Sequence, residues 1–526
     1  MSAIKHVLFI MADQLRADYL SCYGQRRLAT PNIDRIAAKG VRYSRAYTSS
    51  PVCGPARMSL YTGRTAFSHG ATWNFIPLDV GTWTLGDYLR PHGIRVALAG
   101  KTHMRADAEG MARMGLDPRS SLGVLAAECG FEPFERDDGE HPNQNVNPDL
   151  AYNRWLREKG YQSPNPWNDF ANSGQAPDGT VLSGWALRNA AQPARVAEEH
   201  SETPYMTDRA LDFMREAGDK PWVLHLSYIK PHWPYIAPRP YAGMFGREDV
   251  MPAVRHERER EGHPVYRAFQ QMQIGQTFSR DETRQTVIPT YMGLVKQVDD
   301  HLGRILTYLE TSGRKQDTLI IFTSDHGDYL GDHWMGEKEL FHEPSSRVPL
   351  IVHDPSPEAN ATRGSTDERF CEGIDILPTI LDAMGVAVPS HRVEGRSLLP
   401  GIRGTAGPNP SPWREAAFSE IDYSLYKARL ALGVAPDKAR AYMIRSERWK
   451  YVWYKGFGQQ LFDLQNDPQE LEDLGASAAH AAVLSEHQGL LLERLTDRRN
   501  RVTLSDAEVV ARTDGARAKG VIIGEW

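Results

Sequence analysis

Residues 6–14 read HVLFIMADQ, an apolar run of strand length that leads directly into two polar side chains, Asp13 and Gln14. A continuous apolar run is typical of a strand buried on both faces of its sheet, since a half-exposed strand would alternate. The run ends at Asp13 without a small-residue cleavage site, unlike a signal peptide. We therefore predict a first β-strand here and a cytoplasmic protein.

Further apolar runs of this kind are separated by segments with helical spacing; they span residues 95–99, 222–228, 318–323 and 349–353. Helix signals are clearest in two places, residues 31–39, which open with a proline and precede a glycine, and residues 290–309. Strands that alternate with helices predict an α/β fold, with a large mixed central sheet sandwiched between helices.

A stretch rich in Pro and Gly, residues 398–414, interrupts this alternation and predicts a linker. We assign residues 1–410 to the α/β domain and residues 411–526 to a smaller C-terminal α+β unit. That unit should contain a small antiparallel sheet, a helix over about residues 478–498, and a tail. Its predicted strands cover residues 442–444, 449–454 and 460–464.

Composition excludes several classes of protein. The 526 residues carry 61 Lys and Arg against 67 Asp and Glu, with no long basic stretch, which argues against nucleic-acid binding. The apolar runs fall short of the roughly 18 residues that a membrane span requires. Four scattered cysteines are too few for a disulfide framework or a thiolate zinc site.

Polar side chains follow two of the predicted strands. Asp13 and Gln14 end the first, and Asp325 and His326 end the run at residues 318–323. Ligands gather at the carboxyl ends of strands in α/β sheets, so the two pairs could share one site. Their oxygens and imidazole suit Ca²⁺ or Mn²⁺. Taken singly, either aspartate could instead be an ordinary helix N-cap.

Residues 49–64, SSPVCGPARMSLYTGR, place Cys53 just before a helix that Pro55 could start. The cysteine would then face the positive end of a helix dipole, a suitable position for reaction with an anion. The alternative is a half-buried cysteine at a helix start.

With these motifs the chain resembles, over nearly its whole length, the sulfatase family of the alkaline phosphatase superfamily, including its phosphonate monoester hydrolase branch. CGPAR, residues 53–57, is similar to the signature whose cysteine is oxidised to formylglycine. The other matching segments are MADQ (11–14), TPNID (30–34), GKTH (100–103), KPH (230–232), TSDHG (323–327) and LFDLQNDP (461–468). The resemblance implies an alkaline phosphatase-like fold and a formylglycine-generating enzyme as maturation partner.

The resemblance also implies a role for each site residue. Modified Cys53 would be the nucleophile, and Arg57 would hold it and offset its charge. Cys53 would contact one divalent metal ion, whose other ligands would be Asp13, Gln14, Asp325 and His326. Positive groups would surround the oxygens of the ester and protonate the leaving alcohol, namely Lys101, His103, His232 and Lys338. Asn74 is a weaker candidate for substrate binding, since it could equally form a turn. We expect Asp332, His333, Glu343 and Arg347 to support the site from outside it.

Two departures from the commoner pattern bear on the substrate. Gln14 and His326 replace the usual Asp and Asn, as in the phosphonate monoester hydrolase and choline sulfatase branches, which should shift the metal toward Mn²⁺. Lys101 and His103 are the sulfatase pair, whereas phosphonate monoester hydrolases tend to carry Tyr and Thr. We therefore expect an arylsulfatase-like hydrolase of small-molecule sulfate esters that also acts on phosphonate monoesters and phosphodiesters. The alternative is that a phosphonate monoester or a phosphodiester is the main substrate.

Two other readings are a catalytically silent binding protein and a two-metal phosphatase with an unmodified nucleophile. The intact Cys53 and Arg57 argue against the first, and no second set of metal ligands is apparent for the other.

The last expectation is a homodimer or higher homo-oligomer. It rests on an insert that contains Trp155, Trp167 and Trp185, and on an apolar tail that ends in Val521, Ile522, Ile523 and Trp526. The alternative is that the tail folds back on its own subunit.

Overall fold

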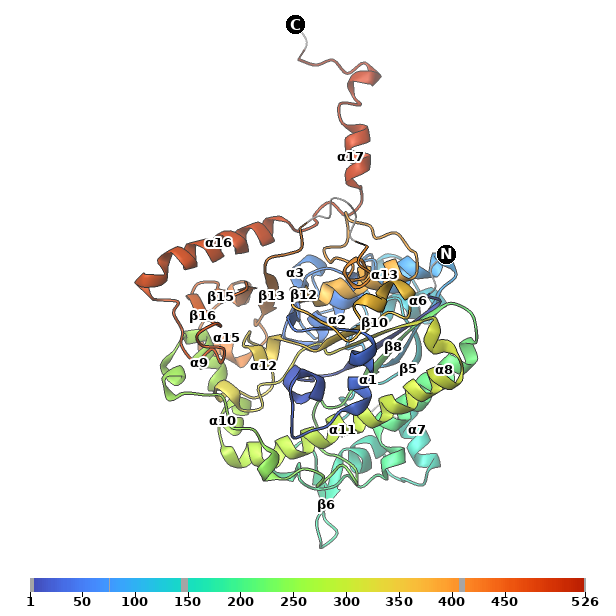
Figure 1. Ribbon diagram of the computed structural model, residues 1–526, viewed down its shortest axis with the longest axis vertical. Helices are drawn as coiled ribbons and strands as arrows, with labels where there is room; N and C mark the ends of the chain where they lie inside the picture. The colour runs from blue at the N-terminus through green and yellow to red at the C-terminus, as the bar shows by residue number, and fades with distance from the viewer. Residues whose placement is uncertain (1–3, 75, 143–149, 406–411, 525–526) are drawn as a thin grey trace.

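The computed structural model describes residues 4–74, 76–142, 150–405 and 412–524. Its centre is an eight-stranded sheet in the order β11-β2-β10-β9-β1-β8-β4-β5 (Figure 1). The strands are β1 (His6–Ala12), β2 (Val41–Tyr43), β4 (Arg95–Gly100), β5 (Glu132–Arg136), β8 (Trp222–Tyr228), β9 (Thr318–Thr323), β10 (Leu350–His353) and β11 (Thr366–Asp367). All five strands predicted for this sheet are present.

The sheet is mixed, as predicted. Strand β1 runs parallel to both of its neighbours, β8 and β9, whereas β10 runs antiparallel to β9 and β2. Because β1 and β9 are parallel and in register, with Met11 opposite Thr323, their carboxyl ends lie side by side. This pairing brings Asp13 and Asp325 to the same edge of the sheet.

Helices cover both faces of the sheet (Figure 1). Leu8, Ile10 and Ala12 of β1 belong to the core beneath α1 (Pro31–Lys39), α8 (Glu202–Ala217) and α11 (Asp281–Thr311). The alternate residues Val7, Phe9 and Met11 belong to the core beneath α2 (Cys53–Thr62), α4 (Leu85–Leu89) and α13 (Ile376–Ala383). The continuous apolar run therefore reflects burial on both faces.

The C-terminal unit contains a four-stranded antiparallel sheet, with its strands in sequence order. They are β13 (Ala417–Asp422), β14 (Arg440–Arg445), β15 (Trp449–Tyr454) and β16 (Gly458–Asp463), and α16 (Ala481–Thr496) packs on the sheet. The other face shares a core with the α/β part, where Val52 and Tyr329 join Met443 and Val452. The predicted boundary at residues 410 and 411 lies outside the described residues.

Shorter elements complete the chain. They are β3 (Ala46–Tyr47), α3 (Ala66–His69), α5 (Ala108–Arg113), α6 (Ser121–Ala127), α7 (Ala151–Glu158), the π-helix η5 (Trp167–Ala171), β6 (Ser173–Gln175), β7 (Val181–Ser183), α9 (Pro264–Gln270), α10 (Gln273–Phe278), α12 (Glu343–Ser346), β12 (Cys371–Glu372), α14 (Leu399–Ile402), α15 (Lys427–Ala431) and α17 (Asp506–Arg512). In the part of the chain that the structure covers, no helix is both long enough and apolar enough to cross a membrane.

The two segments expected to contact a partner differ in exposure. In the aromatic insert Trp167 is fully buried, and only Trp185 is exposed. The C-terminal segment that contains α17 projects from the body of the molecule (Figure 1). Val521, Ile522 and Ile523 are all exposed, and Ile523 retains 97% of its accessible surface. Trp526 lies outside the described residues.

Candidate active site

Four side chains converge where β1, β9 and α2 meet. The potential ligand atoms of Asp13, Cys53, Asp325 and His326 all lie within 4.8 Å of one another, and all four residues are buried. The structure thus brings the two predicted strand ends together, with the cysteine between them.

Arg57 holds this group in place. Its Nη2 donates to Asp13 Oδ2 at 3.0 Å and its Nε donates to Asp325 Oδ2 at 3.0 Å, with all three side chains inaccessible to solvent. Its Nη1 donates to the carbonyl oxygen of Lys101 at 2.7 Å. Burial works against a charged guanidinium, but Asp325 and Asp13 outweigh it and raise the pKa of Arg57. Arg57 lies one turn along the helix from Cys53, and its two ion pairs are with the carboxylates of Asp13 and Asp325.

Helix α2 begins at Cys53 itself, with Val52 as its N-cap, and not at Pro55 as predicted. A proline is tolerated anywhere in the first turn because the N–H groups there have no intrahelical partner. The Cys53 Sγ lies 3.0 Å from His326 Nε2 and 4.0 Å from Asp13 Oδ1. Burial raises the pKa of the Cys53 thiol to about 12, so the unmodified residue is a neutral thiol at physiological pH.

Gln14 is fixed at the same edge by a left-handed backbone, with φ of 62°. Its Nε2 donates to the carboxylate of Asp328 and to the Tyr235 hydroxyl at 3.2 Å. These acceptors orient the amide so that its Oε1 accepts from Lys338 Nζ at 2.9 Å. Asp328 was missed in the sequence, although it follows the TSDHG motif directly.

The four predicted cationic residues are also buried around this group. Lys101 Nζ lies 2.8 Å from Asp13 Oδ2. Burial disfavours a charged ammonium, but Asp13 and Cys53 outweigh it and raise the pKa of Lys101. Burial, reinforced by the charge of Lys101, lowers the pKa of both His103 and His232 well below the usual value. The pKa of Lys338 is likewise raised, because nearby negative charges outweigh its burial. Two lysines that stay charged thus accompany two histidines that are neutral at physiological pH.

Both histidines leave a ring nitrogen unused. Nδ1 of His103 and Nε2 of His232 are buried and have no hydrogen-bond partner among the described residues. The other nitrogen of His232, Nδ1, lies 2.7 Å from the carbonyl oxygen of Trp233. Buried polar atoms are seldom left unsatisfied, so these two nitrogens indicate that an oxygen-rich ligand binds here.

Asn74 contacts the helix start. Its Oδ1 accepts the backbone N–H of Gly54 at 2.8 Å. A Cβ on Gly54 would lie 2.9 Å from the Asn74 Cα, so the two segments are in tight contact. A substrate oxygen could therefore use only the NH₂ group of Asn74.

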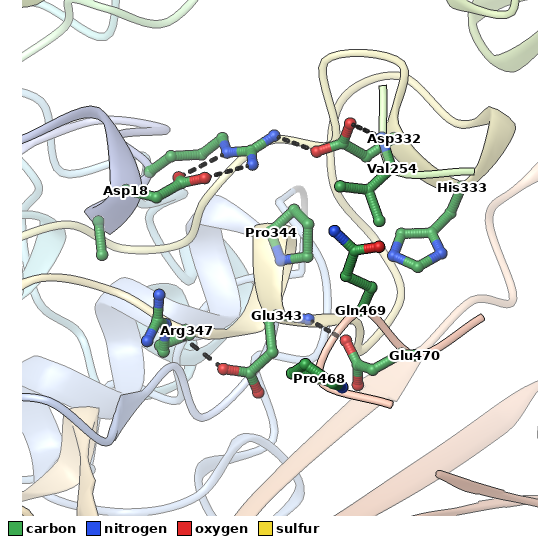
Figure 2. Close-up of a pocket in the computed structure, with 12 residues that line it drawn as sticks. Asp18, Val254, Asp332, His333, Glu343, Pro344, Arg347, Pro468, Gln469 and Glu470 are labelled. Carbon is green, nitrogen blue, oxygen red and sulfur yellow. Dashed lines mark hydrogen bonds and ion pairs between the residues drawn. The ribbon is translucent and has the colours of Figure 1, made fainter. Parts of the chain in front are cut away.

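The residues expected to support the site line a separate cavity of about 170 Å³ (Figure 2). Asp332 accepts from Arg16 at 2.8 Å, and His333 Nδ1 lies 2.6 Å from Glu259. Glu343 pairs with Arg347 at 3.3 Å and with Lys450 at 2.9 Å. These contacts join the chain after β9 to the N-terminal segment and to the C-terminal unit.

The loop after β5 also reaches the site, although no sequence motif marks it. Asp138 Oδ1 accepts the backbone N–H groups of Thr102 and His103, at 3.2 and 3.0 Å. Glu140 Oε1 lies 3.7 Å from both Lys101 Nζ and His103 Nε2. The loop lies in a region without periodicity, and only the pairing of β4 with β5 brings it to the site.

Comparison with known proteins agrees with this geometry. The family model "Sulfatase" matches residues 5–386. The chain belongs to the sulfatase family. A second model, for the C-terminal region of N-sulphoglucosamine sulphohydrolase, matches residues 331–500.

Among sulfatase relatives, the multifunctional alkaline phosphatase superfamily protein PehA of Trinickia caryophylli is 33% identical, over 92% of this chain and 93% of its own. An arylsulfatase of Clostridium perfringens is 25% identical, over 94% and 95%. The phosphonate monoester hydrolase of Agrobacterium radiobacter superposes with a TM-score of 0.79 at 30% identity, covering 93% of this chain and 95% of that chain. The phosphonate monoester hydrolase SpPMH of Silicibacter pomeroyi gives 0.81 at 28%, covering 95% and 97%.

The family implies, in general, a metal ion and formylglycine. The residues of this sulfatase fit a divalent ion, because two carboxylates and an imidazole meet residue 53 in one buried cluster. The oxygen of Gln14 is held at the same edge by Asp328, Tyr235 and Lys338. The protein is therefore a hydrolase of the sulfatase superfamily.

Proposed function

We propose that this sulfatase hydrolyses sulfate monoesters, as arylsulfatases do, through a formylglycine made from Cys53 by a formylglycine-generating enzyme. The observation that carries the proposal is the placement of Lys101 and His103, the sulfatase pair, beside Asp13 and its metal cluster. Lys101 neutralises a sulfate oxygen, and His103 offers a nitrogen that no described protein group satisfies.

Residue 53 needs the modification for a physical reason. The buried thiol is protonated at physiological pH and is a poor nucleophile. Its Sγ marks the position of one hydroxyl oxygen of the hydrated aldehyde, 3.0 Å from His326 and at the positive end of α2. A divalent ion held by Asp13, Gln14, Asp325 and His326, Mn²⁺ in preference to Ca²⁺, would act as a Lewis acid that lowers the pKa of that oxygen.

The reaction then follows from two hydroxyls on one carbon. One oxygen attacks sulfur in line, and the bond from sulfur to the alcohol oxygen breaks as the new bond forms. Lys101 and Lys338 neutralise the transferring group. His103 or His232 takes up a proton when the negatively charged ester binds beside it, and gives that proton to the leaving alcohol. The second hydroxyl then loses its proton, the aldehyde re-forms, and sulfate leaves, so no water attacks the covalent intermediate.

A second candidate function is hydrolysis of phosphonate monoesters or phosphodiesters with the same residues. It is supported by the similarity to the two phosphonate monoester hydrolases and by the pair Gln14 and His326. These esters and sulfate monoesters each carry one negative charge on a tetrahedral centre, so we expect activity on both classes.

The test is a comparison of kcat/KM for 4-nitrophenyl sulfate and 4-nitrophenyl phenylphosphonate, which release the same phenol. The proposal predicts a higher value for the sulfate, and the reverse order would make the second candidate the main function. Cys53→Ala is the matched control, since it removes the nucleophile and should abolish both activities. Turnover of neither ester by the matured, metal-loaded protein would refute both functions.

A further inference from the structure

Glu140 places a negative charge next to the groups that should bind a negative substrate. Its Oε1 lies 3.7 Å from Lys101 Nζ and equally far from His103 Nε2. The Glu140 side chain is 29% exposed, whereas Lys101 is inaccessible and His103 nearly so. The carboxylate therefore covers both groups from the solvent side.

The Glu140 carboxylate is not needed to hold the backbone of the neighbouring GKTH segment in place. The backbone of the GKTH segment is already held by Asp138, which accepts the N–H groups of Thr102 and His103. A separation of 3.7 Å is too long for a hydrogen bond, so Glu140 acts on Lys101 mainly through its charge.

We propose that Glu140 is a charge filter, which makes the site accept esters whose transferred group carries one negative charge and reject those that carry two. The inference rests on the proposed function, since it assumes that Lys101 and His103 bind the oxygens of the transferred group. Sulfate monoesters, phosphonate monoesters and phosphodiesters carry one charge. Phosphate monoesters carry two above their second pKa of about 6.

The second charge would lie against the Glu140 carboxylate at close range in a largely buried pocket. At a charge separation of about 6 Å and an effective dielectric constant of about 20 to 40, its repulsion should lower the affinity for the doubly charged ester about 10- to 100-fold. The residue thus acts on specificity and not on the chemical step.

The experiment compares three esters of 4-nitrophenol, namely the sulfate, the phenylphosphonate and the phosphate, at about pH 8, where the phosphate carries two charges. Glu140→Gln keeps the shape of the side chain and removes its charge. We expect kcat/KM for the phosphate, relative to the phenylphosphonate, to rise about 10- to 100-fold, mainly through a lower KM. Glu140→Asp keeps the charge and should keep most of the selectivity.

Glu132→Gln is the matched control. Glu132 starts β5, the strand that precedes the loop with Glu140, and pairs there with Arg95 at 2.6 Å. The change removes the same charge away from the site and should leave the ratio unchanged. Thermal melting of Glu140→Gln shows whether the variant is folded, and a folded variant with an unchanged ratio overturns the proposal.

The substrate's own titration gives a second readout. Below about pH 6 the phosphate ester becomes singly charged. In the wild type the ratio of phosphate to phenylphosphonate turnover should rise as the pH falls through this value, and in Glu140→Gln the rise should be smaller. An equal rise in both proteins contradicts the filter.

Failure of the inference and failure of the proposed function give different results. If the wild type hydrolyses the phosphate as well as the phenylphosphonate, the filter is wrong and the hydrolase function stands. If Glu140→Gln lowers turnover of all three esters alike, the residue serves the chemistry and the filter is again wrong. If the wild type hydrolyses none of the three, the proposed function fails and the filter with it.

Discussion

Two carboxylates and one guanidinium form the buried centre of the site. Asp13 and Asp325 each need a counter-charge once they are removed from water, and Arg57 supplies it at 3.0 Å to both. Burial opposes ionisation of Asp13, but Lys101 and Arg57 outweigh it and lower its pKa. The Asp13 carboxylate therefore remains charged and available to a metal ion.

Arg57→Met should leave both carboxylates without this partner. Removing one member of a buried ion pair costs about 3–5 kcal/mol, so we expect a large loss of stability as well as of activity. Urea unfolding of the metal-free protein measures the loss of stability. The control is Arg35→Met, which breaks the exposed pair with Glu310 and should cost about 1 kcal/mol or less. Equal costs for the two variants would contradict the assignment of Arg57.

His103 and His232 can be distinguished as proton donors by the leaving group. Replacing the true acid by Ala should cost roughly 10² to 10⁴ in rate for poorly leaving alcohols and much less for activated phenols, which depart without a proton. A series of aryl sulfates with phenols of different pKa measures this dependence. If both variants lose the same factor across the series, neither histidine is the acid, and Lys338 is the next candidate.

At the scale of single elements, the start of α2 matters most. Gly54 lets the first turn approach Asn74, and an added Cβ would meet backbone atoms at 2.9 Å. The helix start carries Cys53, so any displacement of this turn moves the nucleophile.

Gly54→Ala should therefore cost about 1–3 kcal/mol through overpacking and should lower kcat. The matched control is Gly489→Ala in α16, where a Cβ meets nothing within 4 Å and helix propensity should add about 0.5–1 kcal/mol. Thermal melting and turnover of both variants check this. A Gly54→Ala protein as stable and active as the wild type would show that the contact is unimportant.

The elements show what the sequence could predict. The central strands were found because each is buried on both faces and reads as one apolar run, as β1, β8 and β9 do. Helix α11 was predicted to begin at residue 290, after a proline, but it begins at Asp281, because Val287 and Ile288 are buried in the core and hold the turn before Pro289.

Some residues of the candidate site could likewise be predicted from the sequence, and others could not. Asp13, Cys53, Asp325 and His326 were predictable because motifs mark them and parallel strands bring their ends together. Glu140 was not, because its position depends on a loop without periodicity and on the pairing of β4 with β5. Arg57 was predicted as a site residue, but its partners are set by the packing of α2 over the strand ends.

At the scale of the whole molecule, the C-terminal segment has little contact with its own body. Helix α17 buries none of its residues, and Val521, Ile522 and Ile523 follow it exposed (Figure 1). A contiguous apolar segment of this kind is typical of a contact surface. The alternative was a tail that folds back on its own subunit, but residues 521–523 are exposed in this structure.

We propose that this segment binds a second copy of the chain and forms a homodimer or a higher homo-oligomer. Light scattering should give a multimeric mass for the full-length protein and a smaller mass for a variant that ends at Lys519. A monomeric intact chain would end the proposal, and an unchanged oligomer after truncation would remove only the role of the tail.

The central claim is that modified Cys53 is the nucleophile, and mass spectrometry of the peptide that contains residue 53 tests it most directly. In protein made together with a formylglycine-generating enzyme, the peptide should be about 18 Da lighter than the thiol form, the change from CH₂SH to CHO. Across preparations of different maturation, specific activity should rise in proportion to the modified fraction. A fully active preparation that contains only the thiol would contradict the account.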